Sequence, residues 1–250
     1  MKKTIVTLML LAGVASAASI GYDEMNDTQK ADVVAYWSDT QHLTSTSDVY
    51  SDNNTGTSFT ISFDIANINI TSTDSNIASF AGSHHAYGWD DGKMFIRMSE
   101  SGSLTLINTN GTSTNSWSEY FDGSTYGNQT VSAYSSDLGL TSADSLTTTT
   151  TFTLVSDIAN QTFTIYKNGT QIDQWTNWNT DTGLDGFQFG GRYGGGTKLA
   201  EGESVDFDNI TVWNKALTES EVSALIIPEP ATATLSLLAL CGLAARRRRK

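Results

Sequence analysis

The stretch from residue 203 to residue 225 reads Glu-Ser-Val-Asp-Phe-Asp-Asn-Ile-Thr-Val-Trp-Asn-Lys-Ala-Leu-Thr-Glu-Ser-Glu-Val-Ser-Ala-Leu. Residues 205–213 alternate apolar with polar side chains, a pattern typical of a strand with one buried and one wet face. Thr218 is a good helix N-cap, and Glu221 three residues later completes a capping box. Leu217 and Val222 have the spacing of a hydrophobic staple. The stretch therefore predicts a strand that leads into a short helix.

The same alternation recurs upstream, in runs that are rich in Thr, Ile, Phe and Val and are separated by Gly, Asn, Asp and Ser. The runs are residues 57–65, 92–98, 102–107, 148–155, 162–166 and 187–190. Asn168-Gly169 is a strong hairpin signal that joins residues 162–166 to residues 171–175. Residues 28–38 fit either a short helix or a strand. Many strands with turns between them predict an all-β sandwich or jelly roll.

Residues 1–17 have the three parts of a secretory signal peptide. Lys2 and Lys3 precede an apolar run over residues 5–14, and Ala15-Ser16-Ala17 is a small-residue cleavage site. The apolar run is too short for an ordinary membrane span. We expect cleavage after Ala17, so that the exported chain begins with a domain over residues 18–226.

Residues 227–250 also fall into three parts. Ile227-Pro228-Glu229-Pro230 holds the only two prolines of the chain, residues 231–245 are uncharged and mostly apolar, and residues 246–250 are four arginines and a lysine. As a helix, the apolar part would be about 22 Å long, which is marginal for a bilayer core of about 30 Å. We expect an apolar C-terminal transmembrane helix with its basic end in the cytoplasm.

The domain between these signals is strongly acidic. Residues 18–226 hold 26 acidic and seven basic side chains, a net charge of about −19, whereas the whole chain carries −13. This charge disfavours nucleic acid and anionic membrane surfaces as partners. Cys241, the single cysteine, lies in the tail, so the domain has no disulfide.

The tail resembles a PEP-CTERM sorting signal, because Pro228-Glu229-Pro230, the apolar segment and the arginine cluster follow in that family's order. The resemblance implies that an exosortase-type membrane enzyme recognises and processes the tail. It also implies export through the inner membrane to the cell surface or extracellular matrix of a Gram-negative-type bacterium. The alternative is a plain membrane anchor that is not processed.

The domain resembles the laminin-G-like (LamG), concanavalin A-like jelly rolls. Residues 207–218 resemble that family's closing strand, residues 163–169 its Tyr-x-(Asp/Asn)-Gly hairpin, residues 57–64 an early strand and residues 190–192 a Gly-Gly segment. Residues 18–56 depart from the pattern. The resemblance implies that Asp208, together with Asp206 on the same face, holds a structural calcium ion (Ca2+). The alternative is that Asp208 hydrogen-bonds a turn.

Catalysis is not expected. Glycoside hydrolases of this fold need two carboxylates on one strand face. The nearest candidates, Glu203 and Asp206, differ in strand parity, and a second Glu is missing. Adjacent His84 and His85 have no third ligand at zinc spacing and are expected to be a polar loop pair.

Aromatic rings on loops are the candidates for sugar binding, because flat rings match the C–H faces of sugars. Trp89, Trp178 and Tyr193 lie in Gly-, Asn- and Asp-rich stretches, and Arg192 beside Tyr193 suits an acidic sugar or carboxylate. The alternative for each of these rings is ordinary packing without a ligand. Trp213 is expected in the core. The first functional hypothesis is a non-catalytic, lectin-like domain for carbohydrate binding or adhesion to a polysaccharide. The alternatives are a structural surface or matrix protein without a discrete ligand site and a glycoside hydrolase.

Overall fold

The computed structural model describes residues 18–52, 55, 58–71, 76–82, 93–98, 103–110, 125–126, 129–130, 132–141, 149–176, 178, 184–191 and 199–227. The expected signal peptide over residues 1–17, the Pro228-Glu229-Pro230 sequence and the apolar stretch over residues 231–245 lie outside these residues. Within the described part, no helix is long and apolar enough to cross a membrane.

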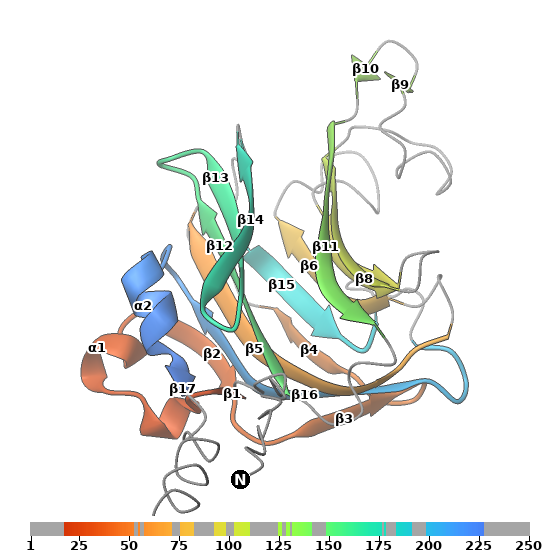
Figure 1. Cartoon of the computed structure of the whole chain (residues 1–250), viewed down its shortest axis with the longest axis horizontal. Helices are drawn as coiled ribbons and strands as arrows, with labels where there is room; N and C mark the ends of the chain where they lie inside the picture. The colour runs from red at the N-terminus through yellow and green to blue at the C-terminus, as the bar shows by residue number, and fades with distance from the viewer. Residues whose placement is uncertain are drawn as a thin grey trace, which may run out of the picture.

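Two antiparallel sheets face each other and form a sandwich (Figure 1). The seven-stranded sheet has the order β14-β13-β12-β5-β16-β2, and β3 also pairs with β16. Its strands are β2 (Val33–Trp37), β3 (Gln41–Thr44), β5 (Phe59–Asn69), β12 (Thr150–Asp157), β13 (Thr162–Lys167), β14 (Thr170–Thr176) and β16 (Ser204–Trp213). The six-stranded sheet has the order β11-β8-β7-β6-β15-β4. Its strands are β4 (Val49–Asp52), β6 (Asn76–Gly82), β7 (Lys93–Met98), β8 (Ser103–Asn110), β11 (Ser132–Thr141) and β15 (Leu184–Phe189).

Short elements complete the description. Two more antiparallel pairs are β1 (Ala18–Ser19) with β17 (Ile226–Ile227) and β9 (Thr125–Tyr126) with β10 (Gln129–Thr130). The described helices are the 3-10 turn η1 (Tyr22–Glu24), α1 (Asp27–Lys30) and α2 (Glu219–Ala224). Residues 28–38 therefore contain both a helix end and a strand, where the sequence allowed either. Residues 18–56, which the sequence pattern did not place, supply α1 and the strands β1 to β4.

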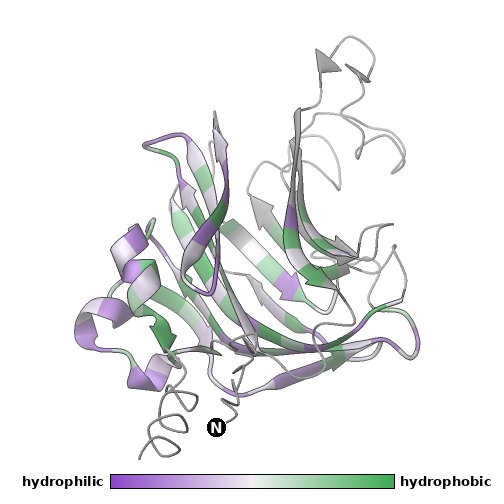
Figure 2. Ribbon diagram, in the orientation of Figure 1, coloured by the Kyte–Doolittle hydropathy of each residue, from purple (hydrophilic) through white to green (hydrophobic). Residues whose placement is uncertain are grey.

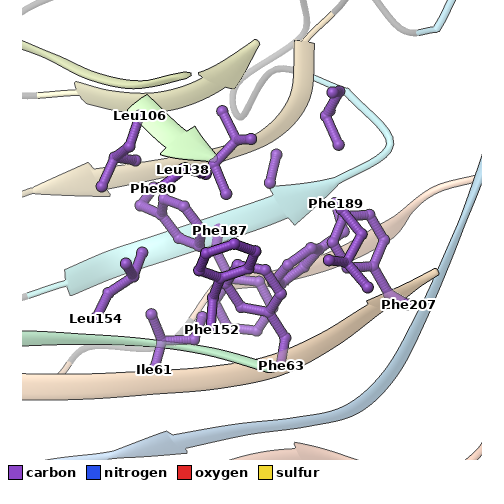
Figure 3. Close-up of a cluster of buried hydrophobic side chains, with 14 of the residues drawn as sticks. Ile61, Phe63, Phe80, Leu106, Leu138, Phe152, Leu154, Phe187, Phe189 and Phe207 are labelled. Carbon is purple, nitrogen blue, oxygen red and sulfur yellow. The ribbon is translucent and has the colours of Figure 1, made fainter. Parts of the chain in front are cut away.

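The main core fills the space between the sheets with phenylalanine, leucine and isoleucine side chains (Figure 3). Phe63 from the seven-stranded sheet contacts Phe189 from the other sheet, with ring centroids 5.2 Å apart in an edge-to-face arrangement. Phe63, Phe187 and Phe207 are fully buried. Figure 2 shows the apolar residues gathered along the strands and the hydrophilic ones on α1, α2 and the turns.

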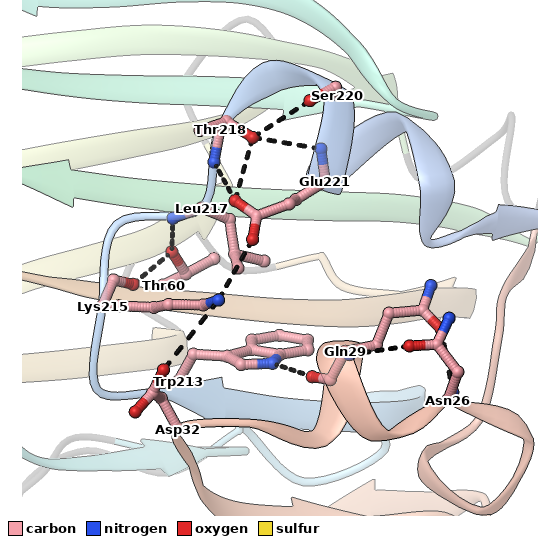
Figure 4. A network of polar contacts seen from close by, with 10 residues as sticks. All are labelled: Asn26, Gln29, Asp32, Thr60, Trp213, Lys215, Leu217, Thr218, Ser220 and Glu221. Atoms are coloured by element: carbon pink, nitrogen blue, oxygen red, sulfur yellow. Dashed lines mark hydrogen bonds and ion pairs between the residues drawn. The ribbon is translucent and has the colours of Figure 1, made fainter.

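A second, smaller core lies on the outer face of the seven-stranded sheet. Val155, Tyr166 and Trp213 point outward and pack against Leu217 and Val222, together with Met25 and Leu225. Trp213 Nε1 donates to the carbonyl of Gln29, so the indole is both buried and hydrogen-bonded (Figure 4). The expectation that Trp213 lies in a core is confirmed.

This outer cover overturns one expectation from the alternating pattern, namely a wet outer face on every strand. The outward Thr60, Ser62 and Asp64 of β5 and Thr151 and Thr153 of β12 are all buried. The segments before β2 and after β16 fold back over these strands. These five polar side chains are hydrogen-bonded; for example, Thr60 Oγ1 donates to the Lys215 carbonyl and accepts from Leu217 N (Figure 4).

The closing strand and its helix form as their sequence predicts. Thr218 Oγ1 accepts from Glu221 N, and the Glu221 carboxylate accepts from Thr218 N at 2.7 Å, which completes the capping box. Asn168 and Gly169 both have positive φ, at 51° and 74°, as the hairpin prediction requires. A bulge at Asp208–Asn209 changes the parity of β16, so that Phe207 and Ile210 both point into the core.

Candidate functional site

Trp178 is not a surface residue, and the prediction that it lies on an exposed binding loop is wrong. Its side chain is 2% exposed, and its ring packs against Phe163 and Trp175. Trp178 Nε1 donates to Ser156 Oγ at 3.0 Å. The ring therefore belongs to the main core. The polar residues around Trp178 in the sequence do not indicate this, because they are not the residues that its side chain contacts.

The other predicted ligand residues, Trp89, Arg192 and Tyr193, lie outside the described residues, as do Pro228, Glu229 and Pro230 of the sorting motif. Their roles stay predictions. Asp206 and Asp208 of β16 are the predicted site residues that lie at the surface of the described part.

Asp206 and Asp208 lie on the outer face of the seven-stranded sheet, near its β2–β3 edge. Val205 and Phe207 point into the core, so the intervening Asp206 points outward. β2 and β3 both pair with β16, at different positions along it. Tyr36 of β2 lies opposite Thr211, and His42 of β3 lies opposite Asp206. The outward side chains of this edge are Tyr36, Thr40, His42, Asn67, Asp206 and Asp208, which we call the edge site.

Asp206 is held between two neighbouring strands. Its Oδ1 lies 2.5 Å from His42 Nδ1 on β3, and its Oδ2 accepts from Asn67 Nδ2 on β5 at 2.6 Å. The His42 side chain is 64% exposed, while that of Asp206 is 16% exposed. When Nδ1–H donates to Asp206, the neutral imidazole presents Nε2 as a hydrogen-bond acceptor. The pair thus presents an oriented ring at the surface.

Asp208 hydrogen-bonds the bulge beside it. Its Oδ1 accepts from Asn209 N at 2.8 Å, and its Oδ2 accepts from Thr40 Oγ1 at 2.9 Å. The turn contact that the sequence left as an alternative is thus present. No set of three or more His, Cys, Asp or Glu side chains in the described residues is placed to hold a metal ion. Calcium binding at Asp206 and Asp208 stays a prediction, which a calcium titration of the melting temperature tests.

Tyr36 supplies an aromatic surface at the other end of the edge site. It is 47% exposed, and its ring stacks on Tyr22 of η1 with the planes 11° apart. Lys30 Nζ lies 5.0 Å from the centroid of the Tyr22 ring, within cation–π range. Tyr36 and His42 are six residues apart along this edge, so they lie at most about 20 Å from each other at about 3.3 Å per residue.

Glu203 does not join this site. The carboxylate is buried; Oε1 accepts from Thr71 N at 2.7 Å and Oε2 accepts from Ala200 N at 2.9 Å. It therefore closes the turn before β16. Of the two carboxylates considered for glycoside hydrolysis, Glu203 and Asp206, only Asp206 lies at the edge site.

The edge site combines a fixed aromatic face with imidazole, amide, hydroxyl and carboxylate groups. A ring of this kind packs against apolar C–H surface, and the polar groups hydrogen-bond hydroxyls. Tyr36, His42 and Asn67 could not be identified from the sequence, because they lie 139 or more residues from Asp206 and share a site with it only through strand pairing. Residues 33–37 are all apolar or aromatic, so no alternation marks Tyr36 as an outward side chain.

No protein-family model and no curated protein sequence matches this chain. Among solved structures, a mutant of the NanB sialidase from Streptococcus pneumoniae matches with a TM-score of 0.50 and 18% identity over 80% of this chain. The fold is a concanavalin A-like jelly roll. The match covers 29% of the sialidase chain, so this chain spans less than a third of that protein.

Two smaller proteins also match. The CBM40 domain of a Ruminococcus gnavus IT-sialidase, solved bound to α2,3-sialyllactose, matches with a TM-score of 0.42 and 16% identity over 68% of this chain and 83% of that chain. A heptameric pentraxin from Limulus polyphemus matches with a TM-score of 0.43 and 18% identity over 68% of this chain and 70% of that chain.

Proposed function

We propose that this protein is an exported, non-catalytic glycan-binding domain, which holds an uncharged polysaccharide at the edge site. The observation that carries the proposal is the exposed Tyr36 ring, which is fixed by Tyr22 on the same face as the His42–Asp206–Asn67 group. Tyr36 packs on one sugar ring of the polysaccharide, while His42 and Asp206 bind hydroxyl groups of another sugar residue further along the same chain.

The charge of the domain selects the class of glycan. A net charge of about −19, with Asp206 and Asp208 at the site, repels carboxylated or sulfated sugars. The carboxylate of Asp206 accepts one hydrogen bond on each oxygen and has lone pairs left for a sugar hydroxyl. Neutral polysaccharides therefore fit the site best. The signal peptide and the Pro228-Glu229-Pro230 tail support delivery to the cell surface.

A glycan array of neutral and acidic polysaccharides, probed with the full chain purified after export, tests the function. We expect binding to one or more neutral glycans and weaker binding to acidic ones of the same backbone. Binding to none would favour the alternative, a structural surface or matrix protein without a ligand site. Release of reducing ends from any polysaccharide on incubation would contradict the non-catalytic part of the proposal.

A further inference from the structure

The two ends of the domain meet in one short pair of strands. Ala18 pairs with Ile227 and Ser19 pairs with Ile226, and Ile20 N donates to the Leu225 carbonyl at 2.7 Å. Ala18 is the first residue expected after removal of the signal peptide. Ile227 directly precedes Pro228, which has no N–H with which to extend the ladder. Both expected processing sites therefore adjoin the β1–β17 pair.

A buried carboxylate holds this pair against the sheet. Both oxygens of Asp64 accept from Ser19 N at 3.1 Å. Asp64 Oδ1 also accepts from Thr151 Oγ1 at 2.5 Å, and Oδ2 accepts from Asn209 Nδ2 at 2.9 Å. Asp64 is 1% exposed and Ser19 is 4% exposed. Four strands, β1, β5, β12 and β16, thus meet at one carboxyl group.

Asp64 has hydrogen-bond donors but no counterion in the described part of the chain. None of the described Lys, Arg or His side chains forms an ion pair with it. Its cross-strand partner on β16 is Asp208, which has the same charge sign. Burial raises the pKa of the Asp64 carboxyl, although the hydrogen bonds from Thr151, Asn209 and Ser19 oppose the rise. An ionised carboxylate in this position is costly without an opposite charge.

We infer that the α-ammonium group of Ala18, which forms when the signal peptide is removed, is the counterion of Asp64 and locks β1 onto β17. An extended residue spans about 3.4 Å, so an ammonium at Ala18 lies within about 7 Å of the carboxylate that binds Ser19 N. Before cleavage the same nitrogen is an uncharged amide. Cleavage between Ala17 and Ala18 hydrolyses one peptide bond, and the new amine takes up a proton. The inference rests on the proposed export and adds that maturation itself stabilises the folded domain.

The test moves the ammonium without removing any contact of Asp64. A Gly-Ser-Gly insertion between Ala17 and Ala18 leaves the cleavage site in place but displaces the new N-terminus. We expect the exported, full-length insertion variant to melt about 2–5 °C below the processed wild type. In an Asp64→Asn background, the same insertion should change the melting temperature by less than about 1 °C, since the charge partner is gone. An equal drop in both backgrounds, or no drop in either, would overturn the inference.

A second measurement keeps the inference testable when the Asp64→Asn chain does not fold. An ion pair holds the α-amino group protonated, so we expect its acetylation at neutral pH, followed by mass spectrometry, to be about tenfold slower in wild type than in the insertion variant. Equal rates would overturn the inference. Intact mass separates the two proposals: a chain that retains Met1 overturns the export proposal together with this one. A chain cleaved at Ala18 with equal rates overturns this inference alone.

Discussion

Tyr36 and Tyr22 stack face to face, with ring centroids 3.8 Å apart. The two residues come from different elements, the edge strand β2 and the turn η1, which crosses the outer face of the sheet. The stack fixes the Tyr36 ring before any ligand arrives. Binding then costs less side-chain entropy than it would with a mobile ring, which is why this contact is central to the proposed glycan site.

The first prediction concerns the hydrogen-bonding half of the edge site. Asp206→Ala removes the acceptor that orients both His42 and Asn67, and we expect it to weaken binding of the array-selected glycan about five- to tenfold. Isothermal titration calorimetry measures the affinity. Glu201→Ala is the matched control, because it removes one negative charge from an exposed position in the turn that precedes β16. Equal losses in the two variants would show a charge effect and contradict a hydrogen-bonding role.

The second prediction separates the core from the site. Trp178→Phe keeps a ring against Phe163 but deletes the donor to Ser156, which leaves a buried hydroxyl without this partner. We expect the free energy of unfolding to fall by about 1–3 kcal/mol, as measured by urea denaturation. Glycan affinity in the folded protein should stay unchanged. A loss of affinity at unchanged stability would return Trp178 to the list of ligand residues.

The third prediction concerns pH and the helix α2. The backbone hydrogen bond from Thr218, together with Lys215, holds the pKa of Glu221 below its ordinary value of 4.5 (Figure 4). A carboxylate whose folded pKa is depressed stabilises the protein above the unfolded pKa and loses this contribution as the pH falls through the folded pKa. At pH 6 the wild type should therefore have a higher melting temperature than Glu221→Gln, and this difference in melting temperature should shrink below pH 4.5.

The measurement for Glu221 is a pair of calorimetric melting curves across pH 3 to pH 7. Glu219→Gln is a suitable control, because Glu219 lies in the same first turn of α2 but does not form the capping box. If the difference in melting temperature between wild type and Glu221→Gln does not change with pH, the charge of the Glu221 carboxylate contributes nothing to the stability of this helix end.

Sequence patterns predicted the elements that local chemistry determines. The capping box at Thr218, the Asn168-Gly169 hairpin and the strand that became β16 all depend on residues within a few positions of one another. Their structures follow the prediction closely. The jelly-roll class followed from the number and spacing of such strands, which the two facing sheets confirm.

Other features depend on contacts between distant segments and could not be predicted. Asp64 belongs to an alternating strand and was expected to face water, but β1, 45 residues away, covers it. His42 and Asp206 are 164 residues apart and meet through the β3–β16 ladder. Trp178 stands among polar residues, yet its ring reaches the core. For Asp64 and for the His42–Asp206 pair the deciding partner is remote in sequence, so a local pattern carries no information about it.

The central claim is that the edge site binds a glycan through Tyr36, and one comparison tests it most directly. Tyr36→Ala and Tyr50→Ala remove tyrosines of nearly equal exposure, 47% and 49%, from edge strands of the two different sheets. Calorimetric titration with the array-selected neutral glycan should show at least about a tenfold loss of affinity for Tyr36→Ala. Tyr50→Ala should bind like wild type. Unchanged affinity in a folded Tyr36→Ala protein would contradict the account.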